Sequence, residues 1–255
     1  MAHPSEISAP SLLPSDGGFS RSVRVAVIDS GVNPRHPHIC GLAGGIVIGE
    51  NSQPEPGDHS DYLGHGTAVT AAIQEKAPDA DYFAVRLFQT SLRTTTDALF
   101  NAIDWAIAER MDVINLSLGT RNPAQRARFQ ETIARACEEG VLLVAARQAG
   151  DDLCYPGSLP GTISVGLDWD CPRERFRYVD QAAEGVFYAS GFPRDLPGMT
   201  RERNLNGISF AVANMCGFVI KACEPAVRDD FRGREKIEAV RRTLVASAMT
   251  TSPEP

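Results

Sequence analysis

The sequence predicts an α/β fold of three layers, in which a doubly wound, mostly parallel sheet carries helices on both of its faces. Two observations predict it. Short apolar runs without polar alternation recur along the chain, which is typical of strands buried on both faces, and helical patterns lie between most of these runs. The length of 255 residues suits one large domain and leaves no room for a second of comparable size.

The first expected strand is the β-branched run at residues 23–28, which ends abruptly at Asp29 and opens into a turn. Residues 1–21, which precede it, are rich in proline, serine and glycine and show no periodicity. We therefore expect a flexible N-terminal arm there, followed by a single domain over residues 22–255. Further strands are expected at residues 82–88, 113–118, 141–146 and 162–165.

The clearest expected helix begins at Asp97, because residues 99–107 place alanine, leucine and isoleucine at the spacing of one helical face. We expect Asp97 to cap its start. Another helix is expected over residues 124–139, and a buried one over residues 212–222. Because open parallel sheets bind their ligands at the carboxyl ends of the strands, a site is expected where Asp29 leaves the sheet.

The composition excludes several classes of function. The formal charge is −7, and no run of lysine or arginine is present to follow a phosphate backbone, so no nucleic-acid partner is expected. No apolar run approaches about 18 residues and the N-terminus lacks a secretion signal, so we expect no membrane partner and a cytoplasmic location. The cysteines show neither CxxC nor metal-site spacing and are expected to be reduced thiols. They are Cys40, Cys137, Cys154, Cys171, Cys216 and Cys223.

Three separated segments carry candidate chemistry. Asp29 follows a strand, His65 stands between Gly64 and Gly66, and Ser209 precedes the buried helix. Each has an ordinary interpretation when taken alone: the aspartate as a turn former, the histidine as a loop residue, and the serine as a helix cap. At a helix N-terminus, however, backbone N–H groups also favour an oxyanion beside a serine nucleophile.

The combination of the three segments is more specific than any one of them. A serine hydroxyl is a poor nucleophile near neutral pH, so a histidine must take its proton, and a buried carboxylate must orient that histidine. Asp29, His65 and Ser209 each have the local surroundings that these roles require. The sequence therefore indicates a catalytic triad.

The three motifs, VAVIDSGV, GHGTAV and NGISFA, resemble those of the subtilisin family of serine peptidases. The resemblance extends over about residues 23–249. It includes the segment from Asn101 to Gly119 and the segment from Tyr155 to Gly166, which are similar to the family's helix, substrate-binding strand and a later strand. It implies a subtilisin-like fold and no cofactor.

By this resemblance Asp29 orients His65, His65 acts as general base and then as general acid, and Ser209 attacks a peptide carbonyl to form an acyl-enzyme. An extended substrate is then expected to pair as an added strand between two segments of the enzyme. The residues of these segments are Ser117, Leu118, Gly119, Leu92, Arg93 and Thr94.

The chain departs from the family pattern around the oxyanion hole. Gln148 stands where the family has an asparagine, and we expect its amide to serve beside the backbone of Ser209. Arg147 replaces a glycine, and its side chain is expected either to fill the pocket for the first substrate side chain or to point to solvent. Cys154 is expected on the floor of that pocket, as a structural thiol or as a redox sensor.

A second departure is the missing calcium-binding loop after the helix that follows His65. The acidic residues near that point, Asp58, Asp61, Asp79 and Asp81, are expected to be solvated in loops, so no metal site is expected. A folding propeptide is not expected either.

We therefore expect an intracellular serine endopeptidase that acts on one or few peptide or protein substrates, such as the leader of a precursor peptide. Two alternatives remain open. The first is a pseudopeptidase that binds peptides or a partner protein with little turnover. The second is an enzyme that transfers the acyl group to a nucleophile other than water. The oligomeric state is not predicted.

Overall fold

The computed structural model describes residues 21–181 and 184–249 of the chain. The predicted N-terminal arm lies outside the described residues, except for Arg21. The guanidinium of Arg21 donates to both carboxylate oxygens of Asp112, at 2.5 and 2.8 Å, so this residue is attached to the domain.

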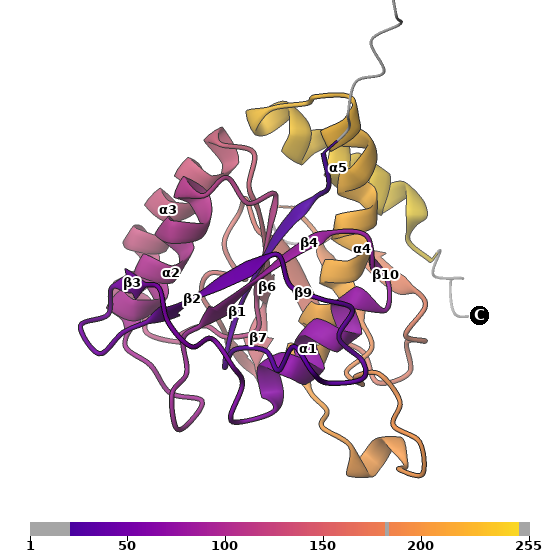
Figure 1. Ribbon diagram of the computed structural model, residues 1–255. Helices are drawn as coiled ribbons and strands as arrows, with labels where there is room; N and C mark the ends of the chain where they lie inside the picture. Colours follow the sequence, from indigo (N-terminus) through magenta and orange to yellow (C-terminus); the bar gives the residue numbers. More distant parts are fainter. Residues whose placement is uncertain (1–20, 182–183, 250–255) are drawn as a thin grey trace, which may run out of the picture.

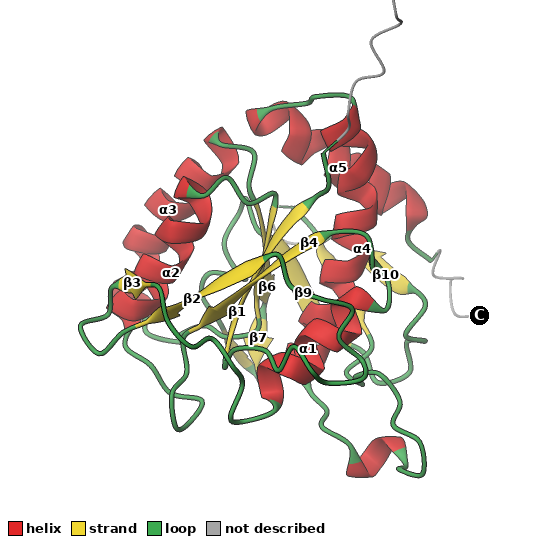
Figure 2. Cartoon of the chain, viewed as in Figure 1, coloured by secondary structure: helices red, strands yellow, loops and turns green. Residues whose placement is uncertain are grey.

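A nine-stranded sheet forms the centre of the described structure (Figures 1 and 2). In the order across the sheet, the strands are β10 (Phe176–Val179), β11 (Val186–Ala189), β9 (Ile163–Leu167), β6 (Leu142–Ala146), β5 (Val113–Leu116), β1 (Arg24–Asp29), β4 (Asp81–Arg86), β2 (Gly44–Ile48) and β3 (Pro54–Glu55). Neighbouring strands are parallel except for the outermost pairs, β10–β11 and β2–β3. The five predicted strands are β1, β4, β5, β6 and β9, all in the interior of the sheet.

Helices cover both faces of this sheet, which confirms the predicted three-layer fold. One face carries α1 (His65–Gln74), α4 (Ile208–Arg228) and α5 (Gly233–Ser247), and the other carries α2 (Thr96–Ala108) and α3 (Arg126–Glu138). Residues of β1 alternate between the two cores: Val25 and Val27 pack with α4, whereas Ala26 and Ile28 pack with α2 and α3. Two short 3₁₀ turns, Pro123–Gln125 and Arg201–Arg203, and the small hairpin of β7 (Gln148–Ala149) and β8 (Asp152–Leu153) complete the elements.

The expected cap of α2 is wrong. The residue before the helix, Thr95, caps it, because its Oγ1 accepts a hydrogen bond from the N–H of Ala98 at 3.1 Å. Asp97 instead lies in the first turn and pairs with Arg128 of α3. A threonine directly before the helix takes the capping position, and the acidic side chain still lies near the positive end of the helix dipole.

The apolar residues of α4 form part of the hydrophobic core. By length and composition alone this helix of 21 residues is apolar enough to cross a membrane, but 72% of its apolar window is buried inside the structure. Met215, Cys216 and Val219 are fully buried against the sheet. A helix that lies across the middle of a large sheet needs apolar residues on most of its surface.

Candidate active site

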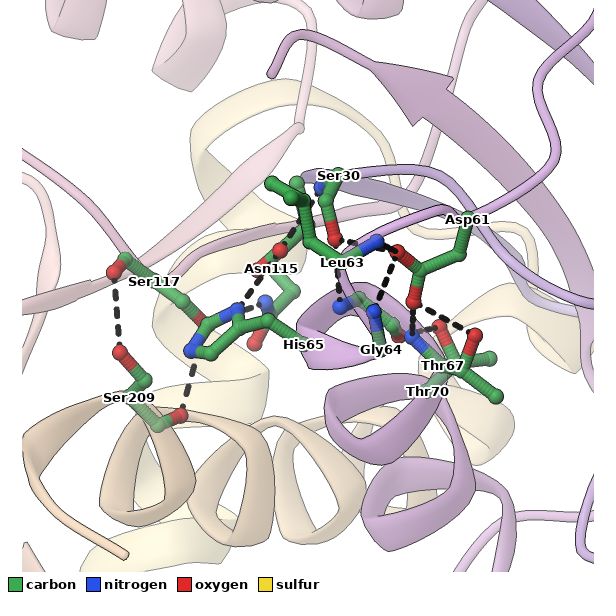
Figure 3. A network of polar contacts seen from close by, with 12 residues as sticks. Ser30, Asp61, Leu63, Gly64, His65, Thr67, Thr70, Asn115, Ser117 and Ser209 are labelled. Carbon is green, nitrogen blue, oxygen red and sulfur yellow. Dashed lines mark hydrogen bonds and ion pairs between the residues drawn. The ribbon is translucent and has the colours of Figure 1, made fainter. Parts of the chain in front are cut away.

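The carboxyl ends of three adjacent strands bring the predicted site together. β6, β5 and β1 are parallel neighbours, so their carboxyl ends lie at the same edge of the sheet. Asp29 ends β1, Ser117 directly follows β5, and Arg147 directly follows β6. The N-termini of α1 and α4, which carry His65 and Ser209, lie at this edge (Figure 3).

Asp29 and His65 form a close pair. Asp29 is buried, with 1% of its surface exposed, and its Oδ1 lies 2.7 Å from His65 Nδ1. The same oxygen accepts a hydrogen bond from the backbone N–H of Ser30 at 2.7 Å. Oδ2 is buried and has no hydrogen-bond partner among the described residues. The carboxylate therefore directs its charge at the imidazole and fixes which ring nitrogen faces away from it.

Two acidic residues raise the pKa of His65. Burial by itself lowers this pKa, because it disfavours the charged imidazolium. The hydrogen bond with Asp29 and the negative charges of Asp29 and Asp61 outweigh burial, so the pKa of His65 is raised above its ordinary value. An imidazole in these surroundings readily accepts a proton, as a general base must.

Asp61 organises the loop that leads into α1, which corrects the expectation of a solvated side chain. Its carboxylate accepts five hydrogen bonds at 2.6–2.9 Å, from Ser30 Oγ, from the N–H groups of Leu63, Gly64 and Thr67, and from Thr67 Oγ1. The other acidic residues of that prediction, Asp58, Asp79 and Asp81, are exposed as expected. No group of three metal-ligating side chains occurs in the part of the chain that the structure describes.

A glycine lets α1 approach the turn after β1. A Cβ on Gly66 would lie 2.2 Å from the carbonyl oxygen of Gly31, so any side chain here would push the helix away. The N–H of Gly66 donates to Ser30 Oγ at 2.8 Å. This close packing brings His65 next to Asp29.

Ser209 lies in the first turn of α4, where its backbone N–H has no acceptor within the helix. Its Oγ donates to the carbonyl oxygen of Ser117 at 3.2 Å, and Ser117 Oγ donates to the carbonyl of Ser209 at 3.4 Å (Figure 3). No hydrogen bond joins Ser209 to His65 in the described structure, although the ring of His65 lies 5.7 Å from the ring of the next residue, Phe210. Rotation about the Cα–Cβ bond of Ser209 redirects its hydroxyl.

A buried polar link holds α1 and α4 together behind the site. Lys76, just after α1, donates from Nζ to Asn214 Oδ1 on α4 at 2.7 Å. Asn214 is fully buried and donates from Nδ2 to the carbonyls of Ser190 and Phe192, both at 2.9 Å. Burial, followed by the charge of Arg173, lowers the pKa of Lys76 to about 8.

The link continues to the start of the helix that carries Ser209. The carbonyl of Gly191, which lies between those of Ser190 and Phe192, accepts a hydrogen bond from the N–H of Gly207 at 2.8 Å. Gly207 is the N-cap residue of α4. The backbone of residues 190–192 therefore accepts hydrogen bonds from Asn214 and from Gly207, and it connects the end of the His65 helix with the start of the Ser209 helix.

The residues predicted for the oxyanion hole lie at the end of β6. Gln148 is exposed at the start of the β7–β8 hairpin, and its amide has no hydrogen-bond partner in the described part of the chain. Arg147 lines a small cavity of about 20 Å³ with Ser158, Ser164, Glu184 and neighbouring residues. None of the other predicted substrate-binding residues borders that cavity.

Cys154 packs against the predicted substrate strand. A Cβ on Gly119 would lie 2.7 Å from the sulfur of Cys154, and the N–H of Cys154 donates to the carbonyl of Arg147 at 2.8 Å. Burial raises the pKa of the Cys154 thiol, which favours the structural interpretation over a redox sensor. Leu118 is partly buried against the core of α2 and α3. All six cysteines are free.

The second predicted substrate segment lies apart from these residues. Leu92, Arg93 and Thr94 are exposed in the loop before α2, and Leu92 is 51% exposed. Arg93 and Thr94 line a cavity of about 180 Å³ together with residues of the loop after β2. No hydrogen bond or ion pair joins this segment to Ser117–Gly119 in the described structure. That a substrate strand fits between them stays a prediction.

Sequence reasoning missed Asp61, the Lys76–Asn214 link and Asn115. Asn115 is fully buried in β5 and donates from Nδ2 to Ser117 Oγ at 2.9 Å. A polar residue in the otherwise apolar run Val113–Leu116 was an available signal, because buried amides need partners. The Lys76–Asn214 pair has no such signal, since 138 positions separate its members.

Comparisons with known proteins agree with this geometry. Residues 20–175, more than half of the chain, match the Subtilase family. Subtilisin NAT of Bacillus subtilis subsp. natto is 30% identical over 231 residues, which cover 84% of this chain and 58% of that relative. An intracellular serine protease of Paenibacillus polymyxa is 27% identical over 229 residues, covering 83% of this chain and 69% of that protein.

Solved structures show the same fold. The prenylagaramide maturation protease PagA aligns with a TM-score of 0.67 at 25% identity, covering 91% of this chain and 85% of its own. A cold-adapted subtilisin-like serine proteinase aligns with a TM-score of 0.62 at 20% identity, covering 88% and 81%. The chain spans only 58% of the length of the first curated relatives. The family is nevertheless shown, because its model matches more than half of this chain. The chain belongs to the subtilase family.

Proposed function

We propose that this chain is a serine endopeptidase whose catalytic residues are Asp29, His65 and Ser209. The observation that carries the proposal is the Asp29–His65 pair, in which a buried carboxylate lies 2.7 Å from the imidazole at the start of α1. Family membership supports it, and so does the place of Ser209 at a helix N-terminus beside the strand end of β5.

The first step releases the hydroxyl of Ser209. In the free protein this hydroxyl is bonded to the carbonyl of Ser117. A substrate that pairs with residues Ser117–Gly119 as an added strand brings a backbone N–H that competes for such carbonyls. The displaced hydroxyl then turns toward His65, whose outward nitrogen takes its proton as Oγ bonds to the scissile carbonyl carbon.

The negative charge that develops on the carbonyl oxygen must be stabilised by hydrogen-bond donors. The backbone N–H of Ser209 and the positive end of α4 supply part of the stabilisation, and we assign the side-chain amide of Gln148 as the second donor. His65 next gives its proton to the leaving amine as the C–N bond breaks. Water then attacks the acyl ester with His65 as base, which restores Ser209 and yields a free carboxylic acid.

We further propose that the enzyme acts inside the cell on one or few peptides, such as a precursor with a leader. Six free thiols fit a reducing compartment. One relative carries the name intracellular serine protease, and one structural neighbour is named a maturation protease. A glutamine in place of the shorter asparagine also favours slow turnover, because its longer side chain has more conformers to restrict.

Digestion of two kinds of substrate tests this proposal. Purified protein and its Ser209→Ala variant are incubated with unfolded casein and with a mixture of random peptides, and the products are identified by mass. We expect cleavage of a small set of peptides by the wild type only, with the masses of the two products adding up to the mass of the substrate plus one water. Rapid general digestion of casein would contradict the restricted substrate range, and products that carry another nucleophile would indicate acyl transfer.

A second candidate function, a peptide-binding pseudopeptidase, is favoured by two observations. Ser209 Oγ is bonded to Ser117 and not to His65, and the amide of Gln148 is not held in place by a neighbour in the described structure. This candidate predicts that the double variant Gln148→Asn with Arg147→Gly gains activity over an inactive wild type. Clear cleavage by the wild type would exclude it.

A further inference from the structure

A pocket of about 230 Å³ lies beside the site, between the turn after β1, the outer side of α1 and the segment that leads to Ser209. We call it the His36 pocket. It is lined by Asn33, His36, His38, Asp61, Gly64, Thr67, Ala68, Ala71, Pro193, Arg194, Leu196, Asn204 and Leu205.

The His36 pocket lies on the far side of His65 from the predicted substrate strand. Figure 3 shows Ser117 and Ser209 on one side of the imidazole, and Gly64 and Asp61 on the other. Gly64 immediately precedes His65 in the sequence, so the pocket begins next to the catalytic histidine. If the acyl half of a peptide follows Ser117, the half that leaves continues toward this pocket.

One part of the pocket is apolar. Ala68 and Ala71 on α1 have the smallest apolar side chains, and they leave space above the helix. Pro193, Leu196 and Leu205 line the opposite side, and Leu205 is 47% exposed. This surface suits an aliphatic side chain of a ligand.

The other part holds one permanent positive charge, that of Arg194, and two histidines. Arg194 is 36% exposed and lies 3.7 Å from Glu75, a contact too long for a strong hydrogen bond. His36 and His38 stand beside it, with their rings 5.2 Å apart. Burial, then the charges of Arg194 and His36, lower the pKa of His38, as expected in a field of positive sign.

The nearby carboxylates do not cancel this field fully. Asp61 lines the pocket and keeps its negative charge, but its carboxylate accepts five hydrogen bonds from the loop and from α1, which engage both of its oxygens. Glu75 is shared, since it also pairs with the buried Arg173. Among the described residues the Arg194 guanidinium makes only the 3.7 Å contact with Glu75, so it has donors left for an incoming carboxylate.

We propose that the His36 pocket binds the part of a peptide substrate that follows the scissile bond, and that it selects an acidic side chain next to an aliphatic one. The inference rests on the proposed peptidase function. It makes Arg194 a specificity-determining residue and names the substrate class as peptides that are acidic after the cleavage point.

Cleavage profiling of a random peptide library tests the proposal with the wild type, Arg194→Gln and Arg194→Glu. For the wild type we expect Asp and Glu to be enriched about fivefold among the residues that follow the scissile bond. The enrichment should vanish in Arg194→Gln and turn into a preference for Lys and Arg in Arg194→Glu. Residues preferred before the scissile bond serve as the internal reference. Cleavage without acidic enrichment, or enrichment that survives Arg194→Glu, would overturn the proposal.

A binding measurement keeps the test independent of turnover. The Ser209→Ala protein is titrated with acetyl-Leu-Glu-Leu-Glu-amide and, as the matched control, acetyl-Leu-Lys-Leu-Lys-amide. The acidic peptide should bind more tightly, and Arg194→Glu should reverse the order; equal affinities would reject the pocket's role. If the library is not cut and Ser209 does not react with a fluorophosphonate, the peptidase function fails. In that case the titration still tests whether the pocket binds acidic peptides.

Discussion

Two buried aspartates at opposite edges of the sheet have opposite surroundings. Asp112 and Asp29 are each only 1% exposed. At the amino edge, both oxygens of Asp112 are occupied, by Arg21, by Lys236 at 2.6 Å and by the N–H of Arg24. At the carboxyl edge, Asp29 Oδ2 has no partner among the described residues, and Oδ1 faces His65.

The difference separates a fully paired carboxylate from one whose main neighbour is an imidazole. Burial by itself raises the pKa of Asp112, but the hydrogen bond from Arg21 and the charge of Lys236 outweigh burial and lower it. A fully paired charge of this kind contributes to stability and has no capacity left for chemistry. The incomplete pairing of Asp29 leaves a charge next to His65, which becomes charged itself in the proposed reaction.

The largest expected effect is on catalysis at the carboxyl edge. Asp29→Asn removes the charge that stabilises protonated His65 and allows the wrong tautomer, so kcat/KM should fall by about 10⁴-fold. The melting temperature should change little, because the asparagine amide can still bind its neighbours. Peptide cleavage and thermal unfolding measured on the same preparation check this. A similar fall of kcat/KM in Asp112→Asn would contradict the difference between the two aspartates.

The next effect is on stability at the amino edge. Asp112→Asn leaves the buried Lys236 without a countercharge and should cost about 3 kcal/mol of unfolding free energy, measured in urea at pH 7. The double variant Asp112→Asn with Lys236→Met should recover part of this free energy. The folded fraction of both variants should keep its peptidase activity. Because the folded pKa of Asp112 is lowered, its contribution is present above the ordinary aspartate pKa. It is lost as the pH falls through the folded value.

A smaller effect concerns the link between α1 and α4, the helices that carry the proposed catalytic residues His65 and Ser209. Lys76→Met removes the donor that fixes the amide of Asn214, and the start of α4 loses part of its support. We expect kcat to fall about tenfold with KM nearly unchanged, because the substrate strand is not touched. Steady-state kinetics check the split. The exposed Lys221 on α4 offers a control, since Lys221→Met should change neither constant.

The smallest effect is a shift in pH dependence. Asp61 contributes to the raised pKa of His65, so Asp61→Asn should lower that pKa. Since His65 must be neutral to accept a proton, the acidic limb of the kcat/KM profile should move to lower pH. Asp58→Asn is the matched control, because Asp58 is exposed and does not contribute to the pKa of His65. An unmoved limb in Asp61→Asn would show that the Asp61 charge does not reach the imidazole.

The sequence was sufficient for features set by local pattern. The five inner strands were predicted because residues buried on both faces form continuous apolar runs. The four outer strands, β2, β3, β10 and β11, were not predicted. They have only two to five residues each, and β2, β3 and β10 are partly exposed, so they form no long apolar run. The helix α5 was not predicted either. Its mean composition is polar, and its buried face depends on contact with α4.

The candidate site was predictable to the same extent. Asp29, His65 and Ser209 stand in short motifs, and the structure brings the first two into contact. Their catalytic roles and the oxyanion role of Gln148 stay predictions. The five hydrogen bonds of Asp61 depend on a loop that folds back on the helix that follows it. The position of the Arg147 side chain depends on packing near β9. Neither can be seen in a pattern of residue types.

Covalent labelling of Ser209 tests the central claim most directly. The full-length protein is treated with a fluorophosphonate probe and its intact mass is measured beside Ser209→Ala, His65→Ala and the stability control Asp112→Asn. We predict one adduct on the wild type and on Asp112→Asn, none on Ser209→Ala, and strongly slowed labelling of His65→Ala. A folded wild type that gains no adduct would contradict the assembly of a reactive serine at the carboxyl edge of the sheet.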